Sequence, residues 1–305
     1  MLVTCYLFCG GAGAGALTVL CVLECLSRSP RFAASSLPDE LFARAWSFAS
    51  VLLGLGVLCL VADLGRPDRM LSLLVEPAFT PVSVGAWALA GSLACAMFFF
   101  ASSWSDSFTP PMPAVVLAAV LGVASGAVTM AYTGVLLQSL ASVLFWQTPL
   151  LTALFVLSSV SCGIACIMLA AVFVEARHPF IGELVSVVRL DGILIAGELV
   201  VLSFYLIWAM SSSGTELAAR ALMEGRYSGV FWCGLVLAGL AVPLIMEFFL
   251  THGNRQQQLL WIAILILVGG FALRVCIVGV SQFDVTQMSG ELYGLSVISL
   301  ADGNA

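Results

Sequence analysis

The sequence predicts an all-α polytopic membrane protein with eight transmembrane helices, on three observations. Hydrophobic residues make up 61% of the 305-residue chain, and charged residues make up only 9%. A typical soluble domain is about 45–50% apolar and about 25% charged, so one soluble core could not bury so much apolar surface. Apolar runs long enough to cross a bilayer recur along the chain, and short polar segments separate them.

A hydrocarbon layer about 30 Å thick requires about 20 apolar residues per helix. The break after the fourth run is the least sharp, because its sequence SLASVLFWQTP is itself apolar. We expect two four-helix bundles, formed by residues 1–140 and 141–282, followed by a C-terminal tail at 283–305. The expected spans are 3–26, 44–62, 82–102, 114–137, 150–173, 190–210, 229–250 and 258–280.

An even number of spans places both termini on one face of the membrane, here called side A; the opposite face is side B. The N-terminus has no basic region before its apolar run, so the first helix is expected to stay in the membrane rather than be cleaved. Cytoplasmic loops carry more arginine and lysine than external loops. Side B carries more arginines near the helix ends, which predicts an inner-membrane protein with extracytoplasmic termini. These are Arg28, Arg31, Arg44, Arg177, Arg189 and Arg255 on side B, and Arg66, Arg69, Arg220 and Arg226 on side A.

The composition argues against several classes of protein. The net charge is −6 and lysine is absent, so there is no basic surface for nucleic acid. The two histidines, His178 and His252, lie in predicted side-B loops, which excludes haem held between paired histidines inside the bundle. The ten cysteines include no Cys-x-x-Cys pair, so we expect no metal or iron–sulfur cluster in this chain.

Besides Arg44 at the start of the second span, five charged residues lie within the predicted spans, where each costs roughly 2.5–3.5 kcal/mol at the helix centre. Glu24 and Glu247 lie near side B, and Arg274 lies deep in the last span. Asp191 and Glu198 are seven residues apart and therefore share a helix face, about 10 Å apart along the axis. The four carboxyls predict a proton path in which Arg274 pairs with a carboxylate. In the alternative interpretation, Glu24, Asp191 and Glu247 only reach the headgroup layer.

Two side-A helix ends carry unusual polar residues. The second span ends in Asp63-Leu-Gly-Arg-Pro-Asp-Arg69, where two aspartates and two arginines crowd a proline-terminated corner. The fourth span contains Ala131-Tyr132-Thr133-Gly134. Tyr132 is either an interface-belt residue or a donor of a hydrogen bond to a carbonyl group in an apolar cleft.

Four ordered segments resemble the NrfD/PsrC family, the membrane subunits of polysulfide-reductase-type and related molybdopterin oxidoreductases. The glycine-rich first helix, GGAGAGA at 10–16, fits the same pattern. The likeness covers most of the chain. The four segments are DLGRPDR at 63–69, AYTGVLL at 131–137, WQTPLLTALFVLSSVSCGIA at 146–165 and LRVCIVGVSQ at 273–282.

The resemblance implies a quinone site near side A, for menaquinone or ubiquinone. Tyr132 would hydrogen-bond the quinone head group with Asp63 nearby, and Arg274 and Gln282 would line the cavity. This chain departs from the family before its first helix, because the segment MLVT offers no histidine or asparagine to the site. The second hydrogen-bonding partner of the quinone is therefore not identified by the resemblance.

The resemblance also implies partner subunits. A ferredoxin-like iron–sulfur subunit would lie against side A, where Arg66 and Arg69 would shape the contact, and it would relay electrons to a molybdopterin catalytic subunit. The expected function is therefore that of a membrane anchor and quinone-binding subunit in anaerobic respiration, with proton translocation through the buried carboxyls. The chain is not expected to be catalytic by itself.

Two other functions fit parts of the pattern. In a secondary transporter, Asp191, Glu198 and Arg274 would bind substrate and a coupling ion, but Pro243 is the only deep proline and has no counterpart in the first half. A structural anchor without quinone chemistry would leave the cost of burying Arg274 unexplained.

Overall fold

The computed structural model describes nine stretches of the chain: 2–27, 37–64, 81–105, 110–140, 143–174, 181–212, 215–225, 227–249 and 255–302. After residue 280 it describes the backbone only. All regular structure within these stretches is helical. The elements are α1 (Leu2–Ser27), α2 (Asp39–Leu64), α4 (Pro81–Trp104), α5 (Met112–Gln138), η1 (Leu144–Trp146), α6 (Pro149–Val172), α7 (Ile181–Ser211), α8 (Glu216–Met223), η2 (Val230–Ala241), α9 (Val242–Phe248) and α10 (Arg255–Asp302).

The predicted fold class is confirmed, because the described residues contain eight helical spans long and apolar enough to cross a membrane. Each lies within a few residues of its expected position. The starts of two spans follow from local chemistry. Both α5 and α6 carry proline in the first turn, where its missing N–H costs nothing, and the hydroxyl of Thr148 accepts from the amide of Leu150 to cap α6.

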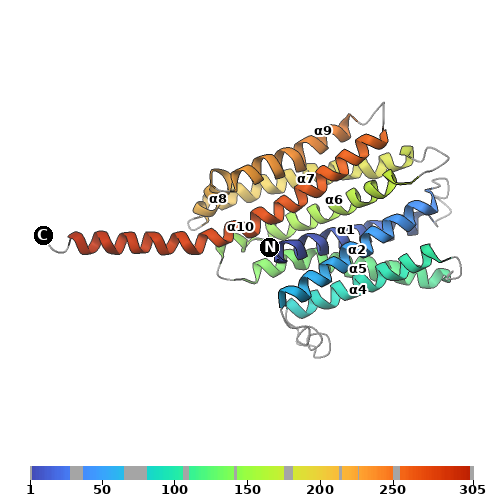
Figure 1. The fold of residues 1–305 in the computed structure, drawn as a ribbon, viewed down its shortest axis with the longest axis horizontal. Helices are drawn as coiled ribbons and strands as arrows, with labels where there is room; N and C mark the ends of the chain where they lie inside the picture. Colours follow the sequence, from blue (N-terminus) through green and yellow to red (C-terminus); the bar gives the residue numbers. More distant parts are fainter. Residues whose placement is uncertain are drawn as a thin grey trace.

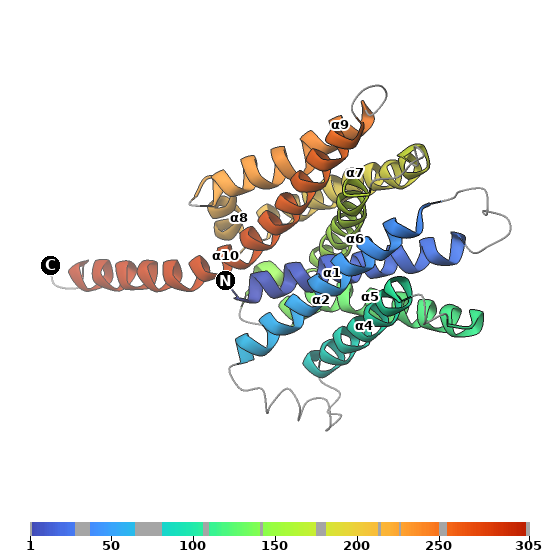
Figure 2. The ribbon, with the colours of Figure 1, turned by 45° about the vertical axis from the view of Figure 1, so that its right-hand side comes forward.

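Helices α1 and α6 form the centre of the molecule (Figures 1 and 2). Helix α1 packs against α2, α5 and α6, while α6 also packs against α7 and α10. Helices α2, α4 and α5 lie on one side of this central pair, and α7, α8, α9 and α10 lie on the other. The division of the chain into halves at residue 140 stays a prediction.

Glycine permits the close crossing of α1 and α6. A Cβ added at Gly15 would overlap the backbone carbonyl of Ser159, and one added at Gly163 would overlap the α1 backbone at Gly15. Small residues at a crossing point let two membrane helices approach backbone to backbone, which increases van der Waals contact. The glycines of the first helix therefore serve packing with α6.

The apolar linker between α5 and α6 folds back into the protein. Its short helix η1 buries Phe145 and Trp146. The indole of Trp146 donates to the carbonyl of Ile277 in α10 at 3.1 Å, and the hydroxyl of Tyr205 in α7 donates to the carbonyl of Phe145 at 2.8 Å. The linker thereby joins the side-A ends of α7 and α10, which explains why its sequence is apolar.

The seventh predicted span consists of two elements rather than one helix. It runs as the π-helix η2 up to Ala241 and continues as α9, whose first turn contains Pro243. In η2, Gly239 contacts Gly269 of α10 so closely that a Cβ on either residue would overlap the other. Hydrophobic periodicity does not signal the π-helix, because every residue of η2 is apolar or small.

We expect Gly15→Ala to lower the free energy of unfolding by about 1–3 kcal/mol, because the added methyl group meets the Ser159 carbonyl at a backbone contact. Gly54→Ala is the matched control, since nothing lies within 4 Å of its added Cβ. Thermal denaturation in mild detergent measures both effects. Equal stability of the two variants would contradict the close crossing of α1 and α6.

Candidate functional site

The guanidinium of Arg274 lies at the centre of the site and is fully buried. Its Nε donates to the carbonyl of Leu7 in α1 at 3.2 Å. Its Nη1 donates to the carbonyl of Gly270 at 2.7 Å and to Ser158 Oγ at 3.2 Å, while Nη2 donates to Ser159 Oγ at 2.9 Å. Arg274 therefore joins the three helices α1, α6 and α10.

Aromatic rings and a glycine complete the surroundings of this arginine. The Arg274 Cζ lies 5.6 Å from the ring centroid of Phe8 and 5.4 Å from that of Phe155. Such cation–π contacts stabilise a cation removed from water. A Cβ at Gly11 would lie 2.6 Å from Ser159 Oγ and 3.0 Å from Nη2, so the glycine leaves room for the hydrogen bond between them.

The predicted ion pair between Arg274 and a carboxylate is not formed among the described residues, where the observed ion pair is Arg220–Glu216. Ser158 intervenes instead, with its hydroxyl accepting from Arg274 and interacting with the Glu198 carboxyl. A hydroxyl can accept one hydrogen bond while it donates another. Ser158 therefore couples the two buried charged groups without direct contact.

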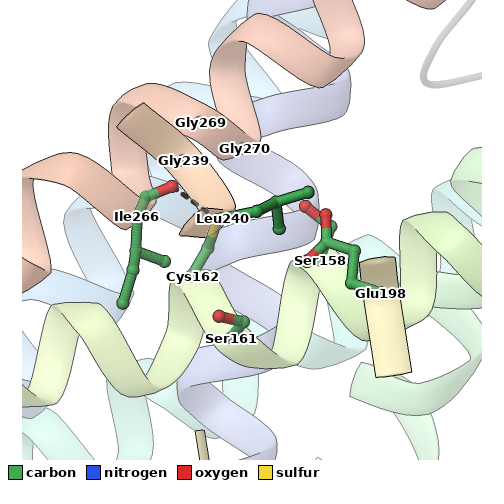
Figure 3. A pocket seen from close by; sticks show the side chains of 9 residues that line it. All are labelled: Ser158, Ser161, Cys162, Glu198, Gly239, Leu240, Ile266, Gly269 and Gly270. Carbon is green, nitrogen blue, oxygen red and sulfur yellow. Dashed lines mark hydrogen bonds between the residues drawn. The ribbon is translucent and has the colours of Figure 1, made fainter. Parts of the chain in front are cut away.

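A small cavity lies beside Glu198 (Figure 3). It is lined by Ser158 and Ser161 of α6, by Glu198 of α7 and by glycines of η2 and α10. Its volume of about 10 Å³ is close to the smallest space that can hold one water molecule, and polar groups line it. The closeness of Gly239 to Gly269 positions two of its walls.

Two further carboxyls meet on the side-B flank of the cavity. Asp191 is fully buried, and its carboxyl lies beside Glu247 of α9 and Ser161. The oxygens of all three side chains make no hydrogen bond in the described part of the chain. Glu24 is also buried, on α1 near Cys21. The structure therefore gathers Asp191, Glu198 and Glu247 around α6, while Glu24 lies on another helix.

At the side-A end, Tyr132 is buried and its side chain interacts with that of Tyr6 in α1. The ring of Tyr132 rests on Gly85 of α4, where a Cβ would overlap it. Tyr6 directly precedes Leu7, whose carbonyl binds Arg274. One turn of α1 thus contributes partners to both Tyr132 and Arg274.

Other predicted site residues are placed less fully. Asp63 is exposed at the side-A end of α2. Arg66, Arg69 and the side chain of Gln282 lie outside the described residues. Their predicted roles at the quinone site and the partner contact stay predictions.

Sequence reasoning missed Tyr6 and the serines of α6. Tyr6 is one apolar-face residue among many, and nothing in its neighbourhood signals that it meets a tyrosine 126 positions later. The serines of SSVSC at 158–162 did carry a signal, because three hydroxyls within one helical turn must find polar partners in an apolar span. Arg274 binds Ser158 and Ser159, Glu198 lies beside Ser158, and Asp191 lies beside Ser161 without a hydrogen bond to it.

The fold and the site together define a multi-pass α-helical membrane protein with a row of buried polar side chains. The chain matches the model of the family described as "Polysulphide reductase, NrfD" over residues 1–286, so it belongs to that family.

Similarity to individual proteins agrees with this family. The chain is 28% identical to the C subunit of polysulfide reductase from Wolinella succinogenes over 300 residues, which covers 91% of this chain and 92% of that protein. It is 31% identical to protein NrfD of Escherichia coli and 28% identical to an NrfD homolog of Haemophilus influenzae, each over 173 residues. These two alignments cover 56% of this chain, and 52% and 51% of the relatives.

We expect Arg274→Lys to destabilise the protein by at least about 2 kcal/mol, because an ammonium group cannot reproduce the fork that binds Leu7, Ser158 and Ser159. Arg220→Lys is the matched control, since Arg220 makes an exposed helix-surface ion pair with Glu216. Thermal unfolding in detergent provides the comparison. If both lysine variants unfold at the wild-type temperature, Arg274 does not hold the three helices together.

Proposed function

We propose that this chain is the membrane subunit through which an extracytoplasmic molybdopterin oxidoreductase exchanges electrons with the quinone pool. A quinone or quinol binds near side A, and its electrons pass between the head group and an iron–sulfur subunit docked on that side. Membership of the NrfD family supports this proposal. The structural observation that carries it is the buried pair of hydroxyls of Tyr6 and Tyr132 near the side-A helix ends.

The two tyrosines fit a quinone head group chemically. Quinone oxygens accept hydrogen bonds, and a phenolic hydroxyl in an apolar environment is a good donor. Tyr132 would donate to a head-group oxygen, while Tyr6 holds the Tyr132 hydroxyl in place. Tyr6 is therefore proposed as a positioning residue for Tyr132. A bound quinol supplies two electrons and two protons.

The remaining predicted residues have distinct proposed roles. Asp63, at the exposed end of α2, would exchange protons with side A, and Gln282 would line the same end of the site. Arg274 would act through α1, because its guanidinium is already bound to protein groups. Arg66 and Arg69 would contact the iron–sulfur subunit.

We further propose that the buried carboxyls carry protons between Arg274 and side B. The order of contacts supports this path: Arg274 binds Ser158, Ser158 contacts Glu198, and the cavity beside Glu198 is also lined by Ser161, which lies beside Asp191. Glu247 follows Asp191 toward side B, and Glu24 would provide a separate group at that end. Proton carriage through this path would couple turnover to the membrane potential.

We expect Tyr132→Phe to lower quinol-dependent turnover of the purified complex while artificial-dye turnover stays unchanged, because only the quinone site loses a hydrogen-bond donor. Tyr205→Phe is the control: it removes a buried hydroxyl that binds only the Phe145 carbonyl, so any loss should affect both assays equally. Parallel loss of both activities in Tyr132→Phe would indicate misassembly and contradict the quinone role.

We expect Glu198→Gln to reduce proton movement per quinol oxidised in proteoliposomes, because an amide cannot take up and release a proton at this position. Glu224→Gln, at an exposed residue after α8, should leave both turnover and proton movement unchanged. Wild-type turnover together with wild-type proton movement in Glu198→Gln would remove Glu198 from the path.

A further inference from the structure

Asp191, Glu247 and Ser161 come from three different elements and meet in the interior. Asp191 lies on α7 and is fully buried, Ser161 lies on α6 and is 1% exposed, and Glu247 lies on α9. Glu247 packs against the α7 backbone, because a Cβ added at Gly192 would lie 2.8 Å from its Oε2. Two carboxyls and a hydroxyl therefore face one another between the helices.

These side chains lack the partners that buried polar groups normally have. Both oxygens of Asp191, both oxygens of Glu247 and the hydroxyl of Ser161 are buried without a hydrogen bond in the described part of the chain. Buried polar atoms in native proteins are almost always hydrogen-bonded, so an unpartnered group points to something that the protein chain itself does not supply. Five such oxygens at one place point to a bound cation.

No basic side chain among the described residues neutralises this pair. Arg274 is bound to Ser158, Ser159 and two backbone carbonyls, on the far side of Glu198. Arg189 precedes Asp191 by two residues, which places it on the opposite face of α7, and it is exposed. Glu198, the other charged group acting on Asp191, is itself acidic.

Electrostatics then requires a positive charge between the two carboxyls. The effective cost of burying one unpaired ion is several kcal/mol, and two adjacent carboxylates also repel each other. We propose that Asp191, Glu247 and Ser161 form a binding site for a single monovalent cation, which is either a proton or Na⁺. Oxygen ligands suit a small hard cation. Among the described residues, no group of three or more acidic, cysteine or histidine side chains is arranged to hold a metal ion, which disfavours a multivalent ion here.

This site goes beyond the proton path proposed above, because it assigns one shared cation to a pair of carboxyls and does not depend on quinone binding. The site also has a route on each side. Ser161 lines the cavity beside Glu198, and Glu247 is only partly buried near the side-B end of α9. The cation can therefore enter from side B and lie close to Glu198, which is connected to Arg274 through Ser158.

Labelling with dicyclohexylcarbodiimide tests the proposal on the intact purified complex. This apolar reagent reacts with protonated carboxyls in membranes and leaves an adduct that peptide mass spectrometry locates. The rate of labelling at Asp191 and Glu247 is measured at neutral pH in choline chloride and in an equal concentration of sodium chloride. A quinone-free preparation serves equally well, so failure of the quinone proposal would not affect the result.

We expect an adduct on Asp191 or Glu247 in choline chloride. A several-fold slower reaction in sodium chloride identifies the cation as Na⁺, whereas equal rates in the two salts identify it as a proton. Absence of an adduct on both residues in choline chloride, with their peptides recovered, would overturn the proposal.

Variants of the two carboxyls test whether Asp191 and Glu247 share one cation. In Asp191→Asn, Glu247 has no second carboxylate with which to share a cation, and burial still disfavours its ionised form, so its labelling should be at least as fast as in the wild type and equal in the two salts; Glu247→Gln should do the same to Asp191. Asp39→Asn and Glu224→Gln, at exposed residues, should leave both rates unchanged. Labelling of the remaining carboxyl that falls in both site variants, or that sodium chloride still slows, would contradict a shared cation. The wild-type comparison of salts stands without the variants if either fails to fold.

Discussion

The burial of one guanidinium is the constraint on which the rest of the structure depends. Arg274 is fully buried, so its donors must find partners inside the protein, and these come from the α1 backbone, the serines of α6 and its own helix. This requirement fixes the depth of α1 relative to α6 and α10. The glycines at positions 11, 15 and 163 follow from it, because the donors reach their partners only if α1 and α6 approach backbone to backbone. The close packing of the central helices and the hydrogen bonding of the buried arginine therefore depend on each other.

The same arrangement joins the two ends of the membrane span. On side A, Tyr6 meets Tyr132, and the next residue of α1 binds Arg274. Toward side B, Ser158 leads to Glu198, and the cavity and Ser161 lead to Asp191 and Glu247. In the proposed function, a change of charge at one end acts on the other through this short series of adjacent polar groups. Such a series fits a subunit that couples a reaction at side A to ion movement across the protein, and a purely structural anchor would not need it.

The sequence predicted the eight spans, because hydrophobicity and helical spacing are properties of single segments. It could not predict contacts between segments. Ser158 stands between Arg274 and Glu198 where an ion pair was expected, and this depends on how α6 is rotated against α7 and α10. Asp191 was open to a headgroup interpretation, since its distance from the end of the apolar run does not tell whether its face meets lipid or α9. Tyr6 was missed for the same reason. The π-helix η2 was missed because uniform apolar composition masks a change of helical period.

The most direct test of the account is to purify the native complex in mild detergent, extract it for quinone and identify the accompanying subunits. We expect bound menaquinone or ubiquinone together with an iron–sulfur subunit and a molybdenum-containing subunit. A lone, quinone-free polypeptide would contradict it, and the polar groups around Arg274 would then have to be interpreted as part of a transport site.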